Sequence, residues 1–317
     1  MKQILALIGF LLPGLAAGQQ AMPDSVRHRA DSATIHQLDN FFSQQDSLDI
    51  FELIDSLIRT QDIKDESRMA VRLGYNSNII ADNRTFNINQ FGLASGMSYY
   101  HKSGLYADAT QYWSQEYKPN FYLTTASGGY MKNINKWYTL LAEYSHYFYH
   151  QPSDSTVSVP YTNNVGMSNY FEVGKFVFRL DYYFYFGDKQ AHRIMPSAGM
   201  NFIKRKWAGF DRISFYPNAT VLFGSEQTTS YALYPNPILR LIYNRNHTPK
   251  LPLYYPVNKT EFGVMNYSFS IPITMSRKDW TFLLNYTYSI PKSLPGEDLS
   301  LQSSGYLSFS ITRYIGF

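Results

Sequence analysis

The chain has 317 residues, a formal net charge of +4 at pH 7, and no cysteine. This length suits one barrel or two soluble domains, and a chain without cysteine has neither a disulfide framework nor a lipoprotein-type lipidation site. No phosphate-binding glycine loop or zinc-ligand spacing occurs, so we expect no cofactor, and the small positive charge requires no nucleic-acid partner. Aromatic residues make up 17 % of the chain, with 28 Tyr against 22 Phe. A ring with an apolar body and a polar tip suits a boundary between water and lipid.

Residues 1–18 have the pattern of a secretory signal peptide. Lys2 supplies the positive start, an apolar core runs from Ile4 to Leu15, and Ala16 and Gly18 are the small residues before cleavage near Gln19. The apolar run is too short to span a bilayer as a helix. We therefore expect an exported protein.

Residues 19–66 differ in kind from the rest of the chain. Apolar residues recur here at intervals of three and four, which predicts one or two amphipathic helices. The segment holds ten acidic and four basic residues, a net charge of −6, whereas the residues after it hold 23 basic and 14 acidic ones, a net charge of +9. The near-neutral whole chain therefore consists of two oppositely charged parts.

From Arg68 onward the apolar period changes to two, which predicts β-strands. The clearest strand is 176–187, where Phe178, Leu180 and Tyr182 alternate with Arg179 and Asp181. The pattern predicts an all-β, antiparallel up-and-down transmembrane barrel over residues 67–317, with about 12 strands. The expected strands are 68–79, 91–100, 104–115, 121–131, 137–149, 162–172, 176–187, 194–203, 212–223, 261–273, 280–290 and 305–317.

The predicted connections alternate in length. Those after even-numbered strands are short, and most of those after odd-numbered strands are long, which is typical of transmembrane barrels and places both ends of the barrel segment on the short-turn side. The longest loop, Gly224 to Thr260, contains an apolar stretch, Ile238 to Tyr243, that could add strands, so 14 strands are an open alternative. The predicted short turns carry a net charge of +7 from Lys102, Lys132, Lys136, Lys175, Lys204, Arg205, Lys206, Arg212, Arg277 and Lys278 against Glu172, Asp211 and Asp279.

The last strand, Gly305 to Phe317, alternates apolar and polar residues and ends on an aromatic one. Phe309, Ile311, Ile315 and Phe317 share the apolar parity, and this pattern resembles the closing strand of bacterial outer-membrane β-barrel proteins, in the aromatic-rich style of the Bacteroidota. The resemblance implies that the barrel-assembly machinery reads these four residues during insertion. It further implies contact with outer-membrane lipid and chain termini in the periplasm. Arg313 departs from the pattern, which is tolerable where a long side chain snorkels to an interface.

Few charged residues take the inward parity, and they are of both signs: Arg72, Asp108, Glu143, Arg179 and Asp181. They are candidate lumen residues, either as a structural ion-pair network or as a selectivity filter. Inward tyrosines would narrow a lumen of this size. Ser145 and His146 are adjacent, so they point to opposite faces and form no hydrolase pair. We expect no enzymatic activity.

Two functions fit the sequence. The first is a narrow channel or transporter for small solutes, partly closed by residues 19–66 or by the Gly224–Thr260 loop. The second is a non-conducting scaffold that assembles with a periplasmic or surface protein.

Overall fold

The computed structural model describes residues 67–77, 92–115, 119–150, 161–233, 236–246, 254–295 and 301–316. The predicted signal peptide and the predicted helical segment, 1–18 and 19–66, lie outside the described residues, as does Phe317.

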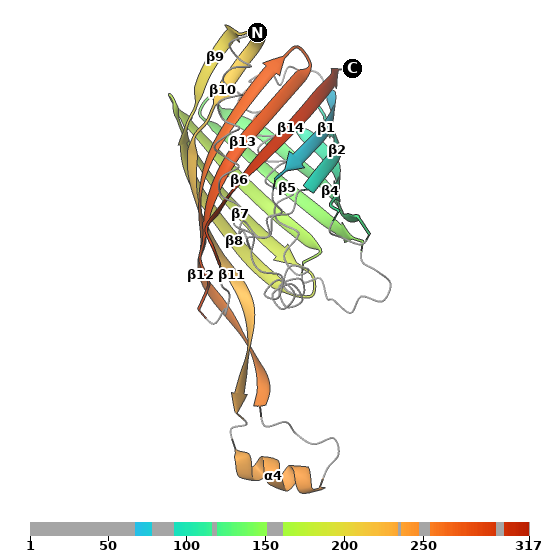
Figure 1. Ribbon diagram of the computed structural model, residues 1–317, viewed down its shortest axis with the longest axis vertical. Helices are drawn as coiled ribbons and strands as arrows, with labels where there is room; N and C mark the ends of the chain where they lie inside the picture. Colours follow the sequence, from blue (N-terminus) through green and yellow to red (C-terminus); the bar gives the residue numbers. More distant parts are fainter. Residues whose placement is uncertain are drawn as a thin grey trace, which may run out of the picture.

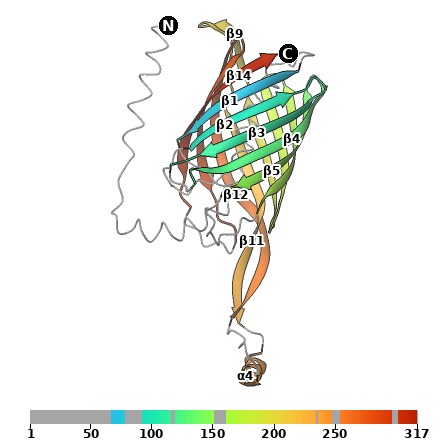
Figure 2. The same cartoon turned by 90° about the vertical axis from the view of Figure 1, so that its right-hand side faces the viewer.

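The described chain forms a closed antiparallel barrel of twelve strands with two further strands at one rim (Figures 1 and 2). Sequential neighbours pair around the ring, and pairing of the first strand with the last closes it. Eight strands precede the extra pair: β1 (Arg68–Asn76), β2 (Gly92–Tyr100), β3 (Leu105–Trp113), β4 (Phe121–Asn135), β5 (Tyr138–Tyr149), β6 (Asn163–Val173), β7 (Phe176–Phe186) and β8 (Gln190–Met200). The others are β9 (Phe202–Trp207), β10 (Phe210–Phe215), β11 (Asn218–Leu233), β12 (Tyr254–Arg277), β13 (Trp280–Pro291) and β14 (Ser304–Gly316).

The two faces of the wall differ as the alternation predicts. In β7, Phe178 and Leu180 are 49 % and 45 % exposed, whereas Val177 and Tyr183 are 2 % and 1 % exposed. A closed ring leaves no unpaired edge, and an apolar exterior with a polar interior is the arrangement that lipid requires of a spanning β-structure. The predicted fold class is confirmed.

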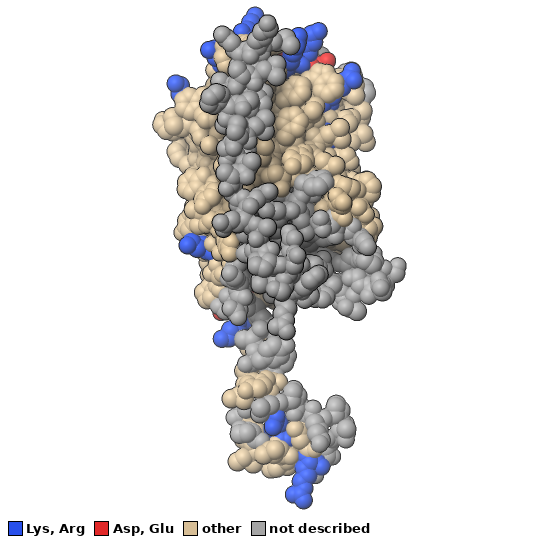
Figure 3. Space-filling view, in the orientation of Figure 1, with Lys and Arg blue, Asp and Glu red and all other residues tan. Residues whose placement is uncertain are grey.

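The two ends of the barrel have different connections. At one end, here called the turn end, neighbouring strands are joined by tight turns such as Gly174 and Lys175 between β6 and β7. Both ends of the described barrel lie there, because Arg68 pairs with Gly316. Three exposed tryptophans mark the same end: Trp137, Trp207 and Trp280. On the face shown in Figure 3, basic side chains gather at this rim, and the described residues visible directly below it are mostly uncharged.

The strands around Pro217 differ from the prediction. The expected strand 212–223 is broken there into β10 and β11, because proline has no amide hydrogen for the ladder. The expected turn from Lys204 to Asp211 is instead a hairpin of β9 and β10, which turns through Ala208 and Gly209, both with positive φ. This hairpin leaves the ring, and β10 pairs with the last residues of β12. The expected strands 194–203 and 261–273 are observed as β8 and as the much longer β12.

Most of the described part of the predicted Gly224–Thr260 loop is not a loop. The strands β11 and β12 remain paired out to Leu233 and Tyr254, forming a two-stranded ribbon that projects beyond the barrel (Figures 1 and 2). At its tip lies α4 (Pro237–Asn246), where Ile238 to Tyr243 was a candidate strand. Asn236 caps this helix, since its Oδ1 accepts from the Ile238 amide at 3.1 Å, and Pro237 takes the first helical position. The two strands beyond twelve are thus β9 and β10, and no described helix has the length and apolar character needed to cross a bilayer.

Candidate functional site

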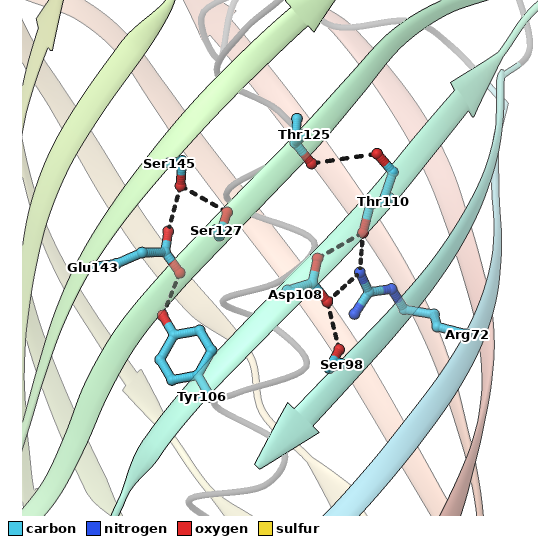
Figure 4. Close-up of polar contacts among 9 residues, drawn as sticks. All are labelled: Arg72, Ser98, Tyr106, Asp108, Thr110, Thr125, Ser127, Glu143 and Ser145. Carbon is cyan, nitrogen blue, oxygen red and sulfur yellow. Dashed lines mark hydrogen bonds and ion pairs between the residues drawn. The ribbon is translucent and has the colours of Figure 1, made fainter. Parts of the chain in front are cut away.

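The five candidate lumen charges all lie on the inner face of the wall. Arg72, Asp108, Glu143 and Asp181 are each at most 5 % exposed, and the side chain of Arg179 is 12 % exposed. Arg72, Asp108 and Glu143 come from β1, β3 and β5, which are close together around the ring (Figure 4). Arg179 and Asp181 both belong to β7.

The first group is centred on Asp108. Arg72 Nη2 lies 3.4 Å from Asp108 Oδ2 and donates to Thr110 Oγ1 at 2.7 Å. The hydroxyls of Ser98 and Thr110 both donate to the carboxylate, the latter at 2.8 Å. Cross-strand register explains the group, because Asp108 pairs with Ser98 and Thr110 pairs with Gly96, which in turn pairs with Arg72.

Glu143 has a different set of partners. Tyr106 donates its hydroxyl to Oε2, and Ser145 donates to Oε1 at 3.1 Å while lying 2.8 Å from the Ser127 hydroxyl (Figure 4). Among the described residues, the hydrogen bonds to the Glu143 carboxylate come only from these hydroxyls, so its charge is not offset by an arginine in contact. Ser145 is buried on the inner face. His146 takes the opposite parity of β5 and is hydrogen-bonded to Asn163.

Arg179 and Asp181 form a compact pair on one strand. Arg179 Nε lies 2.7 Å from Asp181, and the guanidinium carbon is 5.2 Å from the centroid of the Tyr170 ring. Residues two apart on a strand point to the same face, so this ion pair forms within β7 and uses no charged residue of a neighbouring strand.

A third ion pair lies where the sequence pattern predicts loops. Arg193 Nη2 lies 2.8 Å from Glu226 Oε2, and the Tyr161 hydroxyl donates to Oε1 at 2.8 Å. Both residues were assigned to loops, since β8 was expected to begin at 194 and the ninth expected strand to end at 223. If the expected strand 194–203 is extended back to Ala191, then Ala191, Arg193 and Met195 share one parity, and this parity places Arg193 on the inner face.

Four large inward side chains each lean over a glycine directly opposite on the next strand. The cross-strand pairs are Arg72 with Gly96, Tyr106 with Gly129, Tyr183 with Gly166, and Arg193 with Gly224. A Cβ on these glycines would lie 2.8 Å from Arg72 Nη2, 2.6 Å from Tyr106 Cε1, 2.5 Å from Tyr183 Cδ1 and 2.7 Å from Arg193 Cδ. These four glycine-backed side chains therefore lie against the wall, where the absence of a Cβ leaves space for them.

The charge balance of the inner wall follows from these contacts. The three arginines Arg72, Arg179 and Arg193 are each in contact with a carboxylate, and Glu143 is the fourth carboxylate of the described groups. The sum of these seven charged groups is −1 when all are ionised. In the described part of the chain, no three His, Asp or Glu side chains are placed to hold a metal ion.

Comparisons with known proteins add little to this description. No family model and no curated protein sequence matches the chain. Among solved structures, the chain is similar to the KdgM porin, with 8 % identity and a TM-score of 0.44 over 77 % of this chain and 98 % of that one. It is also similar to the NanC porin, with 11 % identity and a TM-score of 0.42 over 77 % and 98 %. A third is the COG4313 outer membrane channel from Pseudomonas putida F1, with 9 % identity and a TM-score of 0.41 over 79 % and 96 %. At these scores the fold assignment depends on the strand pairing described above and not on the likeness.

Proposed function

We propose that this protein is a narrow channel of the bacterial outer membrane for small solutes. The observation that carries the proposal is the layer of charged and hydroxyl side chains built across the inner wall. A buried ion pair is weak evidence of stabilisation, because desolvation offsets much of the attraction. Three such pairs and a fourth carboxylate on the inward face of one barrel support a charged lining of its interior.

The size of the barrel agrees with a narrow passage. Barrels of about eight strands are filled by side chains, and those of 16–18 strands leave an aqueous channel, so twelve strands give an intermediate lumen. The glycine-backed side chains reduce the obstruction, because Tyr106 and Tyr183 lie along the wall instead of across the lumen. We place the turn end and both chain termini in the periplasm, since short turns are periplasmic in such barrels.

Partial closure is assigned to residues 19–66. The described part of the Gly224–Thr260 segment projects away from the barrel, which argues against its folding over the mouth (Figure 2). Residues 19–66 precede Ser67 directly, and Ser67 lies at the turn end, where its hydroxyl accepts from the Lys102 amide at 3.3 Å. Insertion through the assembly machinery would rely on β14, whose Ile315 is exposed to lipid.

Single-channel recording in planar bilayers tests the function. We expect conductance with a preference for cations, because the seven charged groups described above sum to −1. Glu143→Gln should lower that preference, as read from the reversal potential in a KCl gradient. Asp279→Asn removes the same charge from an exposed turn and is the matched control, with a smaller expected effect. Absence of conductance both in the full chain and in a chain lacking residues 19–66 would refute a channel.

The second candidate is a scaffold, and the tip of the ribbon favours it. In α4, Ile238, Leu241 and Ile242 are 68 %, 62 % and 53 % exposed and follow the spacing of one helix face. Exposed apolar side chains grouped in this way mark protein contact sites. Absence of conductance together with stoichiometric co-purification of another envelope protein, lost on replacing Leu241 by Ser, would support the scaffold over the channel.

A further inference from the structure

The hairpin of β9 and β10 is a second charged feature, outside the barrel ring. It stands at the turn end beyond the strands of the closed wall (Figure 1). All six residues of β9 are exposed, and within the described chain β9 pairs only with β10, so its other edge is open. Open edges are usually protected by charge or covered by another segment.

The two faces of the hairpin carry different basic residues. Arg212 pairs with Ser276 of β12, whose hydroxyl lies 3.2 Å from that of the inward Thr281. Arg212 therefore faces the inside of the barrel. Arg205 pairs directly with Arg212 and shares this face, whereas Lys204 and Lys206 belong to the outer face.

The direct pairing of Arg205 with Arg212 is unfavourable by itself. Like charges opposite each other on neighbouring strands destabilise the pair. The hairpin has four basic residues and one acidic residue, Asp211, which accepts from the Lys278 amide at 2.7 Å. Two arginines placed side by side on a mouth-facing surface are the arrangement that carboxylates bind.

We propose that the inner face of this hairpin binds the acidic segment 19–66 of the same chain. That segment has a net charge of −6 and must leave the described chain at the turn end, since it joins Ser67. Its 48 residues are long enough to reach any point on the rim. Arg205 and Arg212 bind its carboxylates, and Ile203, 46 % exposed on the same face, contacts its apolar residues. The proposal deepens the closure assigned above by naming where the segment is held, and it does not depend on conduction.

The test measures the distance between segment and hairpin in the full chain. The protein has no cysteine, so Ser47→Cys and Ala208→Cys place two nitroxide labels without side reactions, and pulsed electron spin resonance gives their distance distribution. We expect a single narrow distribution in the refolded protein. It should broaden in 1 M NaCl, where the screening length falls to about 3 Å.

The matched variants distinguish the two faces. R205Q/R212Q should broaden the distribution, and K204Q/K206Q, with the same loss of charge on the outer face, should leave it narrow. A broad distribution without substitutions, or an equal response to the two pairs, would overturn the proposal. The heat-dependent gel shift of a closed barrel reports folding of each variant, and the salt titration of the unsubstituted chain tests the contact should the arginine variant not fold.

An anionic lipid surface is the competing ligand of these basic residues. In vesicles containing phosphatidylglycerol, lipid binding predicts that K204Q/K206Q alone changes the membrane depth of the Ala208 label, with a broad distance to residue 47. That result would also overturn the proposal. A narrow distribution in a protein without conductance would leave the docking in place and refute the channel alone.

Discussion

Replacing Gly166 by Ala tests the contact between the inner wall and Tyr183. A Cβ at residue 166 would lie 2.5 Å from Tyr183 Cδ1 and closer still to Cε1, so the ring must leave its position. The ring is 1 % exposed, and forcing extra volume into a packed site costs about 1–3 kcal/mol. The wall blocks movement outward. We therefore expect the ring to move into the lumen, with a lower unfolding free energy and a smaller single-channel conductance.

Gly128→Ala is the matched control. Gly128 lies on the outward-facing parity of β4. The atom nearest to a Cβ added there is the Tyr106 carbonyl oxygen, at 3.8 Å. This substitution should leave the free energy of unfolding unchanged or raise it by about 0.4–1 kcal/mol, because alanine lowers the conformational entropy of the unfolded chain. Reversible urea unfolding in lipid vesicles, followed by tryptophan fluorescence, gives both free energies, and planar bilayers give the conductance.

A double-mutant cycle identifies the ring as the cause. In a Tyr183→Ala background the space over residue 166 is empty, so Gly166→Ala should cost close to nothing, which gives a coupling energy of about 1–3 kcal/mol with Tyr183. The contact does not hold the ring if Gly166→Ala behaves like Gly128→Ala, or if the cost of Gly166→Ala is the same with and without the Tyr183 ring.

Three further predictions concern the wall and its ion pairs. Leu180→Arg, on the lipid face near the middle of β7, should cost about 2–4 kcal/mol in vesicle unfolding, whereas Phe176→Arg at the strand end should cost about 0–1 kcal/mol; equal costs would contradict the membrane placement. Arg193→Met should cost about 3–5 kcal/mol by leaving the Glu226 carboxylate without its cation, and adding Glu226→Gln should recover part of that loss; additive losses would argue against the pair. Arg313→Ala should cost at most about 1 kcal/mol, because among the described residues the exposed guanidinium contributes only a ring contact to the neighbouring tryptophan, and a loss of insertion would refute this.

The sequence predicts the wall well, because the wall has one simple physical rule. A strand between lipid and a polar interior must alternate, and β7 and β13 alternate without exception over most of their length. The same rule puts Arg72, Asp108 and Glu143 on the inward parity, and all three are buried in the structure. Arg313, the exception in β14, is exposed and its guanidinium lies 5.4 Å from the centroid of the Trp280 ring, as expected of a side chain near an interface.

The errors occur where a strand leaves the lipid. Beyond the membrane neither face must be apolar, so Thr228 to Leu233 gives no signal even though it remains paired in the ribbon. For the same reason Arg193 and Glu226 were assigned to loops. The helix α4 lies within the predicted loop, where Ile238 to Tyr243 was an open alternative as a strand because its six residues fit either period. The Asn236 cap decides for the helix in the structure. The glycine-backed contacts depend on register, which alternation alone does not specify.

The pairing of β1 with β14 has a consequence for how the barrel can be made. Residues Arg68 and Gly316 become neighbours although almost the entire barrel sequence separates them. This last ladder can form only after the other eleven junctions have brought the two edges around, and contacts so distant in sequence form slowly. Until then both edges offer unpaired amides and carbonyls to any other strand nearby. The period between synthesis and closure is therefore when this chain most needs a chaperone, and truncation of even the final strand should leave a polypeptide that aggregates or is degraded instead of a shortened barrel.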